Sequence, residues 1–150
     1  MSIDIEIHVK RIQGLIIVHT VLLFLYYYLR HTIDLLFMIE RNLPMIIFFS
    51  VVPLLAVSFL GTAYKRWASI LLLGILFAEL FGLVYFRFTS FPPYSIHEPS
   101  IIVKILYEAA FGCILVIEVV SGWLTGRYLK EIHMRTIVSN QESSVDQNKR

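Results

Sequence analysis

A chain of 150 residues has the length of one small soluble domain, but 57% of these residues are hydrophobic and only 16% are charged, a composition that favours a lipid bilayer as solvent. The formal net charge of +2 is too small to indicate nucleic-acid binding, and the basic residues lie in short flanks beside apolar runs. The single cysteine, Cys113, excludes a disulfide within the chain. We therefore expect an integral membrane protein whose first partner is the lipid bilayer and which binds no nucleic acid.

Four apolar runs have the length of membrane spans. A spanning helix needs about 20 mainly apolar residues, and the helix satisfies its own backbone polar groups where no water is available. The runs occupy residues 12–29, 43–63, 67–86 and 104–126. The sequence thus predicts an all-α integral membrane protein with four transmembrane helices in an antiparallel bundle.

The lysine and arginine residues in the short connections predict the orientation of the spans. Most of them fall in segments that are cytosolic if the amino terminus is inside, so both termini are expected in the cytosol. The domain prediction is a cytosolic segment 1–11, a four-span membrane domain 12–135, and a polar cytosolic tail 136–150 that is expected to be disordered.

The connections differ in character. The segment 30–44, "RHTIDLLFMIERNLP", is apolar enough to predict an interfacial helix or an extension of the first span. The segment 87–100, "RFTSFPPYSIHEPS", contains three prolines that exclude a regular helix. The short segment "TAYKRW" predicts a tight inner turn between the second and third spans.

Tyr26, Tyr27 and Tyr28 at the outer end of the first span are expected to form an aromatic belt at the membrane interface.

Three ionisable residues are predicted to lie near the middle of the membrane. Because a helix rises about 1.5 Å per residue, the sequence distance to a flanking arginine places His19, Glu79 and Glu118 about 12–13 Å from a membrane face. In a hydrocarbon core roughly 30 Å thick, all three then lie near the middle, together with Pro53 of the second span. The prediction is an intramembrane polar cluster of His19, Glu79 and Glu118.

Two interpretations of this cluster remain open. The carboxyl groups either pass protons or bind a cation with His19, or they stay neutral and form hydrogen bonds between helices. We expect no metal site, since one histidine and two acids on separate helices lack the spacing of a metal-binding motif. We also expect no cofactor, because one histidine cannot provide two haem ligands.

Small residues predict helix-packing faces. Gly74, Ala78 and Gly82 are spaced four residues apart and form one flat stripe on the third span, where a neighbouring helix can approach closely. Gly112 and Gly122 predict a similar face on the fourth span.

The expected function is assembly with other membrane proteins or with further copies of the chain, as an accessory subunit, adaptor or tetraspan-like scaffold. The sequence has no activated serine or cysteine arrangement, so we expect no enzymatic activity and no catalytic residues. The alternative is a small proton- or cation-coupled transporter or channel subunit that uses His19, Glu79 and Glu118. The chain is expected to be a multi-pass protein of the plasma membrane or of an internal membrane, and no targeting motif distinguishes the two.

Overall fold

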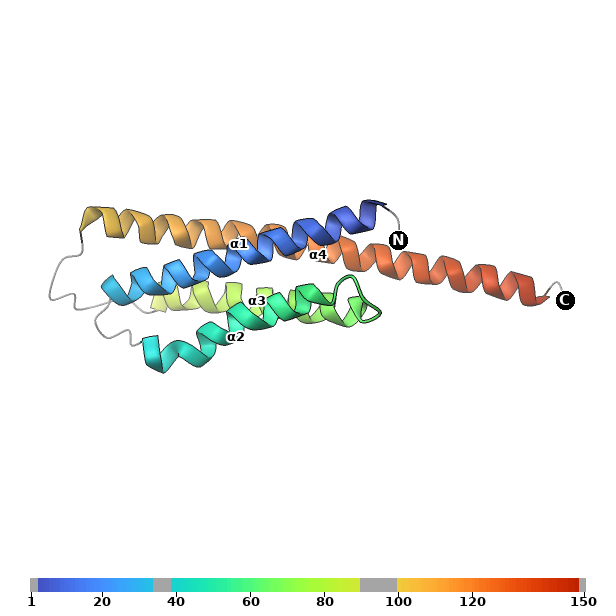
Figure 1. The fold of residues 1–150 in the computed structure, drawn as a ribbon, viewed down its shortest axis with the longest axis horizontal. Coiled ribbons are helices and arrows are strands. Elements are labelled where there is room, and N and C mark those ends of the chain that lie inside the picture. Colours follow the sequence, from blue (N-terminus) through green and yellow to red (C-terminus); the bar gives the residue numbers. More distant parts are fainter. Residues whose placement is uncertain (1–2, 34–38, 90–99, 149–150) are drawn as a thin grey trace.

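The computed structural model describes residues 3–33, 39–89 and 100–148, with side chains described at residues 5–33, 42–85 and 100–138. These residues form four helices, namely α1 (Ile3–Ile33), α2 (Ile39–Ser58), α3 (Lys65–Thr89) and α4 (Ile101–Asn148), which run up and down in an antiparallel bundle (Figure 1). The prediction of an all-α four-helix antiparallel bundle is therefore confirmed.

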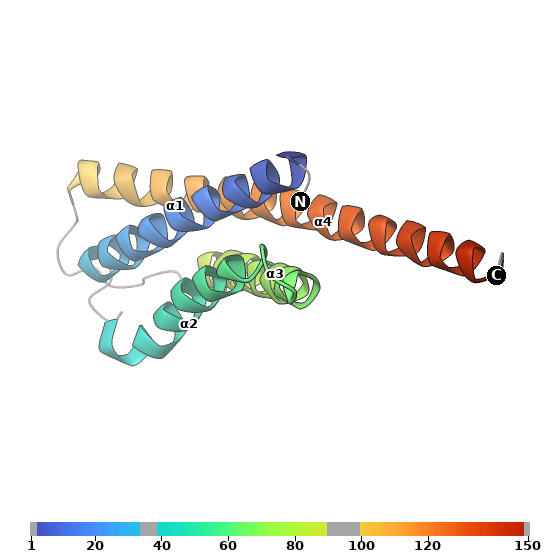
Figure 2. The same cartoon turned by 45° about the vertical axis from the view of Figure 1, so that its right-hand side comes forward.

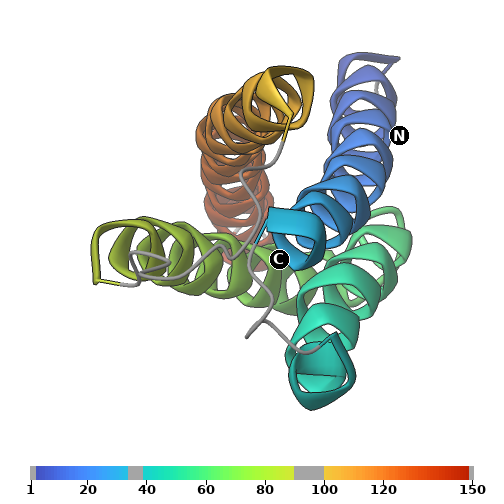
Figure 3. The ribbon, with the colours of Figure 1, turned by 90° about the vertical axis from the view of Figure 1, so that its left-hand side faces the viewer.

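Each helix packs against two neighbours. α1 lies between α2 and α4, and α3 also contacts α2 and α4, so α1 and α3 face each other diagonally across the bundle. The end-on view shows the four helices arranged in the order α4, α1, α2 and α3 around a common centre (Figure 3). A side chain that points inward from one helix can therefore reach the other three.

The turn between α2 and α3 is tight, as the sequence predicts. The Thr62 backbone N–H donates to the carbonyl of Phe59 at 3.1 Å, and the Thr62 carbonyl accepts the N–H of Lys65 at 3.3 Å. The Thr62 hydroxyl also accepts the N–H of Tyr64 at 3.2 Å. These short-range hydrogen bonds satisfy the free ends of both helices and place α2 and α3 side by side.

The outer connections lie partly outside the described residues. α1 continues to Ile33 and α2 begins at Ile39, so the first part of the segment 30–44 extends the first helix. Residues 34–38 and 90–99, which include most of the predicted proline-rich connection, are outside the described residues.

The tail 136–150 was predicted to be disordered, but its described part, residues 136–148, belongs to α4, which continues as one helix to Asn148 and projects beyond the bundle (Figure 2). The sequence after Gly126 contains no glycine or proline that would end a helix. Arg135 also donates to the carboxylate of Glu131, one turn earlier, at 2.8 Å, which favours the helix. A polar composition alone therefore did not predict the backbone conformation of this segment.

Length and composition identify two helical segments that can cross a membrane, rather than four. These are Ile5–Ile33 and Lys65–Tyr85 among the described residues, while the apolar part of α2, Asn42–Ser58, is shorter. The predicted span at residues 104–126 carries three charged residues, Lys104, Glu108 and Glu118. Two such helices are weak evidence for a membrane protein, since a buried core helix or a signal sequence meets the same criteria.

Two apolar clusters fill the bundle. The turn-side cluster lies toward the α2–α3 turn and consists of Ile5, Val9, Ile12, Ile16, Ala56, Val57, Leu60, Ala68, Leu72, Leu76, Leu124, Tyr128 and Ile132. The far-side cluster lies toward the other end and consists of Leu23, Tyr26, Tyr27, Leu29, Ile46, Leu83, Tyr107, Ala110 and Ile114. The core is thus divided into two parts along the helix axes.

The predicted belt of three tyrosines is only partly present. Tyr28 is 63% exposed, whereas Tyr26 and Tyr27 are buried. The Tyr26 ring stacks on Tyr107 of α4 with 4.9 Å between ring centroids, and the two hydroxyl groups lie 2.9 Å apart in a hydrogen bond. Because the polar tip of Tyr26 has this partner, the whole side chain is accommodated inside the bundle.

Tyr128 connects α4 to the end of α2. Its hydroxyl donates a buried hydrogen bond of 2.6 Å to the backbone carbonyl of Leu60. Burial raises the pKa of the Tyr128 phenol, and the nearby charge of Glu131 adds to this effect, so the hydroxyl stays protonated and can donate at neutral pH.

We predict that Tyr128→Phe destabilises the folded protein by about 1–2 kcal/mol, because the Leu60 carbonyl loses its side-chain donor. Thermal unfolding of the detergent-solubilised protein, followed by circular dichroism, measures the effect. Tyr64→Phe is the matched control, since Tyr64 is 66% exposed. Equal losses in the two variants would show that the Tyr128 hydrogen bond contributes nothing specific.

Candidate functional site

A polar layer separates the two apolar clusters. On each of three helices, one ionisable residue lies between the last buried residue of one cluster and the first buried residue of the other. The order is Ile16, His19 and Leu23 on α1, Leu76, Glu79 and Leu83 on α3, and Ile114, Glu118 and Leu124 on α4. Spacings of three or four residues separate His19 and Glu79 from both apolar neighbours, and Glu118 from Ile114, and such spacings keep side chains on one helix face. Each ionisable residue is buried, as these apolar neighbours are.

The structure brings the three side chains of the predicted polar cluster into contact. His19 Nε2 lies 3.4 Å from Glu79 Oε1 and 3.5 Å from Glu118 Oε1. His19 comes from α1, the diagonal neighbour of α3, so its imidazole crosses the centre of the bundle to reach Glu79. We call these three residues the His19 cluster.

The His19 cluster is closed to the surroundings. The exposed fraction is 0% for His19 and 2% for each glutamate. Among the residues that the structure describes, no hydrogen-bond partner is found for either imidazole nitrogen or for any of the four carboxylate oxygens. The contacts to His19 are close enough for an ion pair, but they do not have the geometry of a hydrogen bond.

Burying a charge or an unpaired polar group in the apolar interior costs several kcal/mol, because the group loses its contacts with water. A neutral imidazole has one N–H and can donate to only one carboxylate at a time. One histidine therefore cannot satisfy both glutamates, and the arrangement calls for a further cation, proton or polar group.

Two serines lie in the same region of the core. Ser50 on α2 falls between Ile46 of the far-side cluster and Ala56 of the turn-side cluster, and Ser121 follows Glu118 by one turn on α4. Both are fully buried, and their hydroxyl groups have no partner among the described residues. Sequence reasoning missed Ser50, although a lone hydroxyl within an apolar run was the available signal.

The predicted helix-packing glycines do not make close contacts within the chain. A Cβ atom placed at Gly74, Gly82, Gly112 or Gly122 would meet no other described atom within 4 Å. Gly74 and Ala78 are exposed, whereas Gly82 is half-buried, and Ala78 lies about 100° around α3 from the buried Glu79. Among the described residues, no neighbouring helix therefore packs closely against these glycines.

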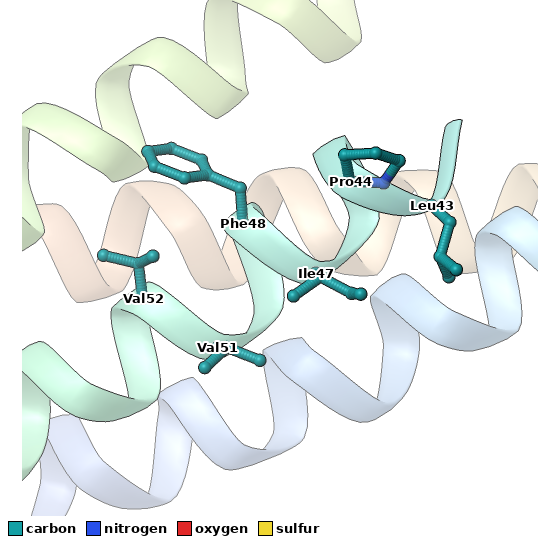
Figure 4. A pocket seen from close by; sticks show the side chains of 6 residues that line it. All are labelled: Leu43, Pro44, Ile47, Phe48, Val51 and Val52. Carbon is teal, nitrogen blue, oxygen red and sulfur yellow. The ribbon is translucent and has the colours of Figure 1, made fainter. Parts of the chain in front are cut away.

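An apolar groove runs along the outer face of α2. Its lining side chains all belong to this one helix and are Leu43, Pro44, Ile47, Phe48, Val51 and Val52 (Figure 4). Since none of these side chains carries a polar group, the groove cannot orient a polar substrate, and we assign no binding site to it.

Comparison with known protein families, with curated proteins and with solved structures found no match. The site is therefore defined by its own geometry, as a buried histidine and two glutamates at the centre of an antiparallel four-helix bundle.

We predict that His19→Leu destabilises the bundle by about 3–5 kcal/mol, because it leaves two buried carboxyl groups without a basic partner. Adding Glu79→Gln and Glu118→Gln to this variant should recover part of the loss, since amides remove the charge and can hydrogen-bond to each other. The measurement is thermal unfolding in detergent, with His133→Leu, an exposed histidine of α4, as control. If the triple variant were no more stable than His19→Leu, the three residues would not act as one unit.

Proposed function

We propose that this chain is a four-span membrane protein with both termini in the cytosol, and that it acts by assembling with membrane partners. The support for the membrane environment is the outer surface of the bundle. Large apolar side chains are exposed on all four helices, including Val21 on α1, Leu55 on α2, Phe77 on α3 and Val116 on α4. The most exposed of these four side chains is Phe77, at 73%. A soluble helix bundle exposes a polar face, whereas a bilayer favours an apolar one.

The observation that carries the assembly proposal is the position of the stripe formed by Gly74, Ala78 and Gly82, in which Gly74 and Ala78 are exposed and Gly82 is half-buried. In a bilayer, helices associate through close van der Waals packing, and small residues allow the two backbones to approach. The stripe is flanked by Phe77 and Phe81, which are both exposed, so a partner helix would fit between these rings and the small residues.

The proposed role is that of an accessory subunit, adaptor or tetraspan-like scaffold, and it is not enzymatic. Gly112 is an exposed small residue on another helix, α4, so the same chain offers a second position for a partner or for another copy of itself. In this role the His19 cluster holds α1, α3 and α4 in a fixed arrangement and thereby fixes which residues face the partner.

We predict that Gly82→Leu lowers partner recovery or self-association by at least about 10-fold, because a large side chain blocks close approach of a helix. The fold itself should tolerate the change, since a Cβ atom at Gly82 meets nothing within 4 Å. Co-purification from mild detergent and cross-linking in membranes measure the association.

Gly14→Leu is the matched control. Gly14 is an exposed helical glycine of α1 with the same open surroundings, but it is not part of a small-residue stripe. Unchanged association in Gly82→Leu, or an equal loss in both variants, would contradict the proposed interface on α3.

A second candidate function is proton or cation passage through the His19 cluster. The observation that favours it is the contact of an imidazole with two carboxyl groups that have no other partner among the described residues. Ionisable groups within membrane spans are most often part of ion or proton pathways.

For this second function we predict that the liposome-reconstituted protein shows proton flux under an imposed potential, and that the Glu79→Gln, Glu118→Gln double variant loses it. An amide cannot release a proton at neutral pH, although it can still form hydrogen bonds. An internal pH dye reports the flux, and Glu108→Gln, which alters an exposed acid of α4, is the control. Absence of flux from well-folded wild-type protein would exclude this second function and leave the assembly proposal unaffected.

A further inference from the structure

The His19 cluster has the composition of a metal site. One donor atom from each of His19, Glu79 and Glu118 can be chosen so that all three lie within 4.8 Å of one another. The donors come from three different helices, and each side chain is at least 98% buried, with its polar atoms unpartnered among the described residues. These atoms converge on a single small volume in the centre of the bundle.

The donor types select among the common metal ions. Mg²⁺ and Ca²⁺ prefer a shell of oxygen ligands, and Mg²⁺ keeps several waters. Thiolate and thioether ligands select Cu⁺, and the cluster contains neither. Imidazole nitrogen together with carboxylate oxygen suits Zn²⁺ and related divalent transition metals.

The distances agree with this selection. Zn²⁺ binds imidazole nitrogen and carboxylate oxygen at about 2.0–2.2 Å, so two ligands at tetrahedral angles lie about 3.3–3.6 Å apart. The two distances from His19 Nε2 to the glutamate oxygens are 3.4 Å and 3.5 Å. An octahedral Mg²⁺ ion would bring its ligands to about 2.9 Å from each other. A charge-assisted hydrogen bond would also be shorter, at about 2.7–2.9 Å.

The charges balance with a divalent ion. Two ionised glutamates and a neutral imidazole carry a net charge of −2, which a divalent cation cancels. A protonated imidazole would cancel only half of it. Because an uncompensated charge in an apolar interior is costly, the divalent ion accounts for the presence of two acids beside one histidine.

We infer that His19 Nε2 and the carboxylates of Glu79 and Glu118 bind one divalent transition-metal ion, with Zn²⁺ as the ion that fits best. The ion joins α1, α3 and α4 at the middle of the bundle. Three protein ligands leave one position of a tetrahedral ion for water or another small ligand. This inference does not depend on the assembly proposal, since no residue of the stripe on α3 takes part.

The absence of a local metal-binding motif does not oppose this site. Motifs such as two histidines one turn apart describe ligands that share a helix. Here each ligand is on a different helix, so only the packing of the bundle brings the ligands together. The sequence-based expectation of no metal site rested on local spacing, which carries no information about such an arrangement.

Titration of the purified full-length protein in detergent with Co²⁺ and Zn²⁺ tests the inference. We expect one Co²⁺ per chain, with the strong visible absorption of a four-coordinate cobalt ion, and loss of this absorption when Zn²⁺ displaces Co²⁺. Excess Mg²⁺ should not compete. Zn²⁺ should also raise the thermal midpoint of the wild-type protein, and a chelator should reverse the increase.

Variants assign the ligands. His19→Gln, Glu79→Gln and Glu118→Gln should each weaken Co²⁺ binding by about 100-fold or more, because each removes a direct ligand. Glu108→Gln and His133→Gln remove an exposed acid and an exposed histidine of α4 and should bind as the wild type does. The Gly82→Leu variant should also bind Co²⁺ as the wild type does. A loss of assembly can then be distinguished from a loss of metal binding.

Two results would overturn the inference. One is wild-type protein that is folded by circular dichroism but binds far less than one Co²⁺ per chain. The other is binding that is unchanged in the three cluster variants, which would assign the ion to surface groups. The number of Co²⁺ ions bound per wild-type chain tests the inference by itself. The test therefore does not depend on whether every variant folds.

Discussion

The contact of His19 with Glu79 and Glu118 at the centre of the bundle is the constraint on which the other features depend. These three side chains are buried between two apolar clusters, where any unpaired charge costs several kcal/mol. The bundle can avoid this cost only if α1, α3 and α4 keep the rotation and axial position that bring the groups together. The polar layer therefore fixes the helix arrangement more strictly than apolar contacts alone, which tolerate small rotations and shifts.

This arrangement also determines the outer surface. Because Glu79 faces inward on α3, Gly74 and Ala78, which lie about 140° and 100° around the helix from it, are turned outward and are exposed. The same logic places large apolar residues such as Phe77 on the exterior, where a bilayer is the favourable surrounding. The interior chemistry and the proposed partner surface are thus two consequences of one helix rotation.

The sequence predicted the helices and the level of the polar residues because both follow from local rules. Long apolar runs indicated the helices, and a constant rise per residue placed His19 and both glutamates at one level along the bundle. The direction of each side chain, and hence the contact itself, depends on how the helices rotate against one another, which no local rule provides. The same limit explains why Tyr26 was expected at the membrane interface but is buried. The sequence did not predict that α4 continues to Asn148, because a polar segment without glycine or proline is compatible with both a helix and a disordered chain.

The three side chains of the His19 cluster would need different surroundings for adhesion between helices through hydrogen bonds, for proton passage and for metal binding. Adhesion needs hydrogen-bond geometry, yet the imidazole nitrogen and both carboxylates have no hydrogen-bond partner among the described residues. Proton passage needs a hydrated path on each side of the cluster, whereas here Ile16 and Leu23 belong to closed apolar clusters on either side of His19. A bound cation would need neither, because it would contact one donor atom of each residue, and the two separations from His19 Nε2, 3.4 Å and 3.5 Å, match those around Zn²⁺. Of the three roles, a bound metal ion would give one donor atom of each residue a partner, and it would brace the bundle for the proposed assembly with partners.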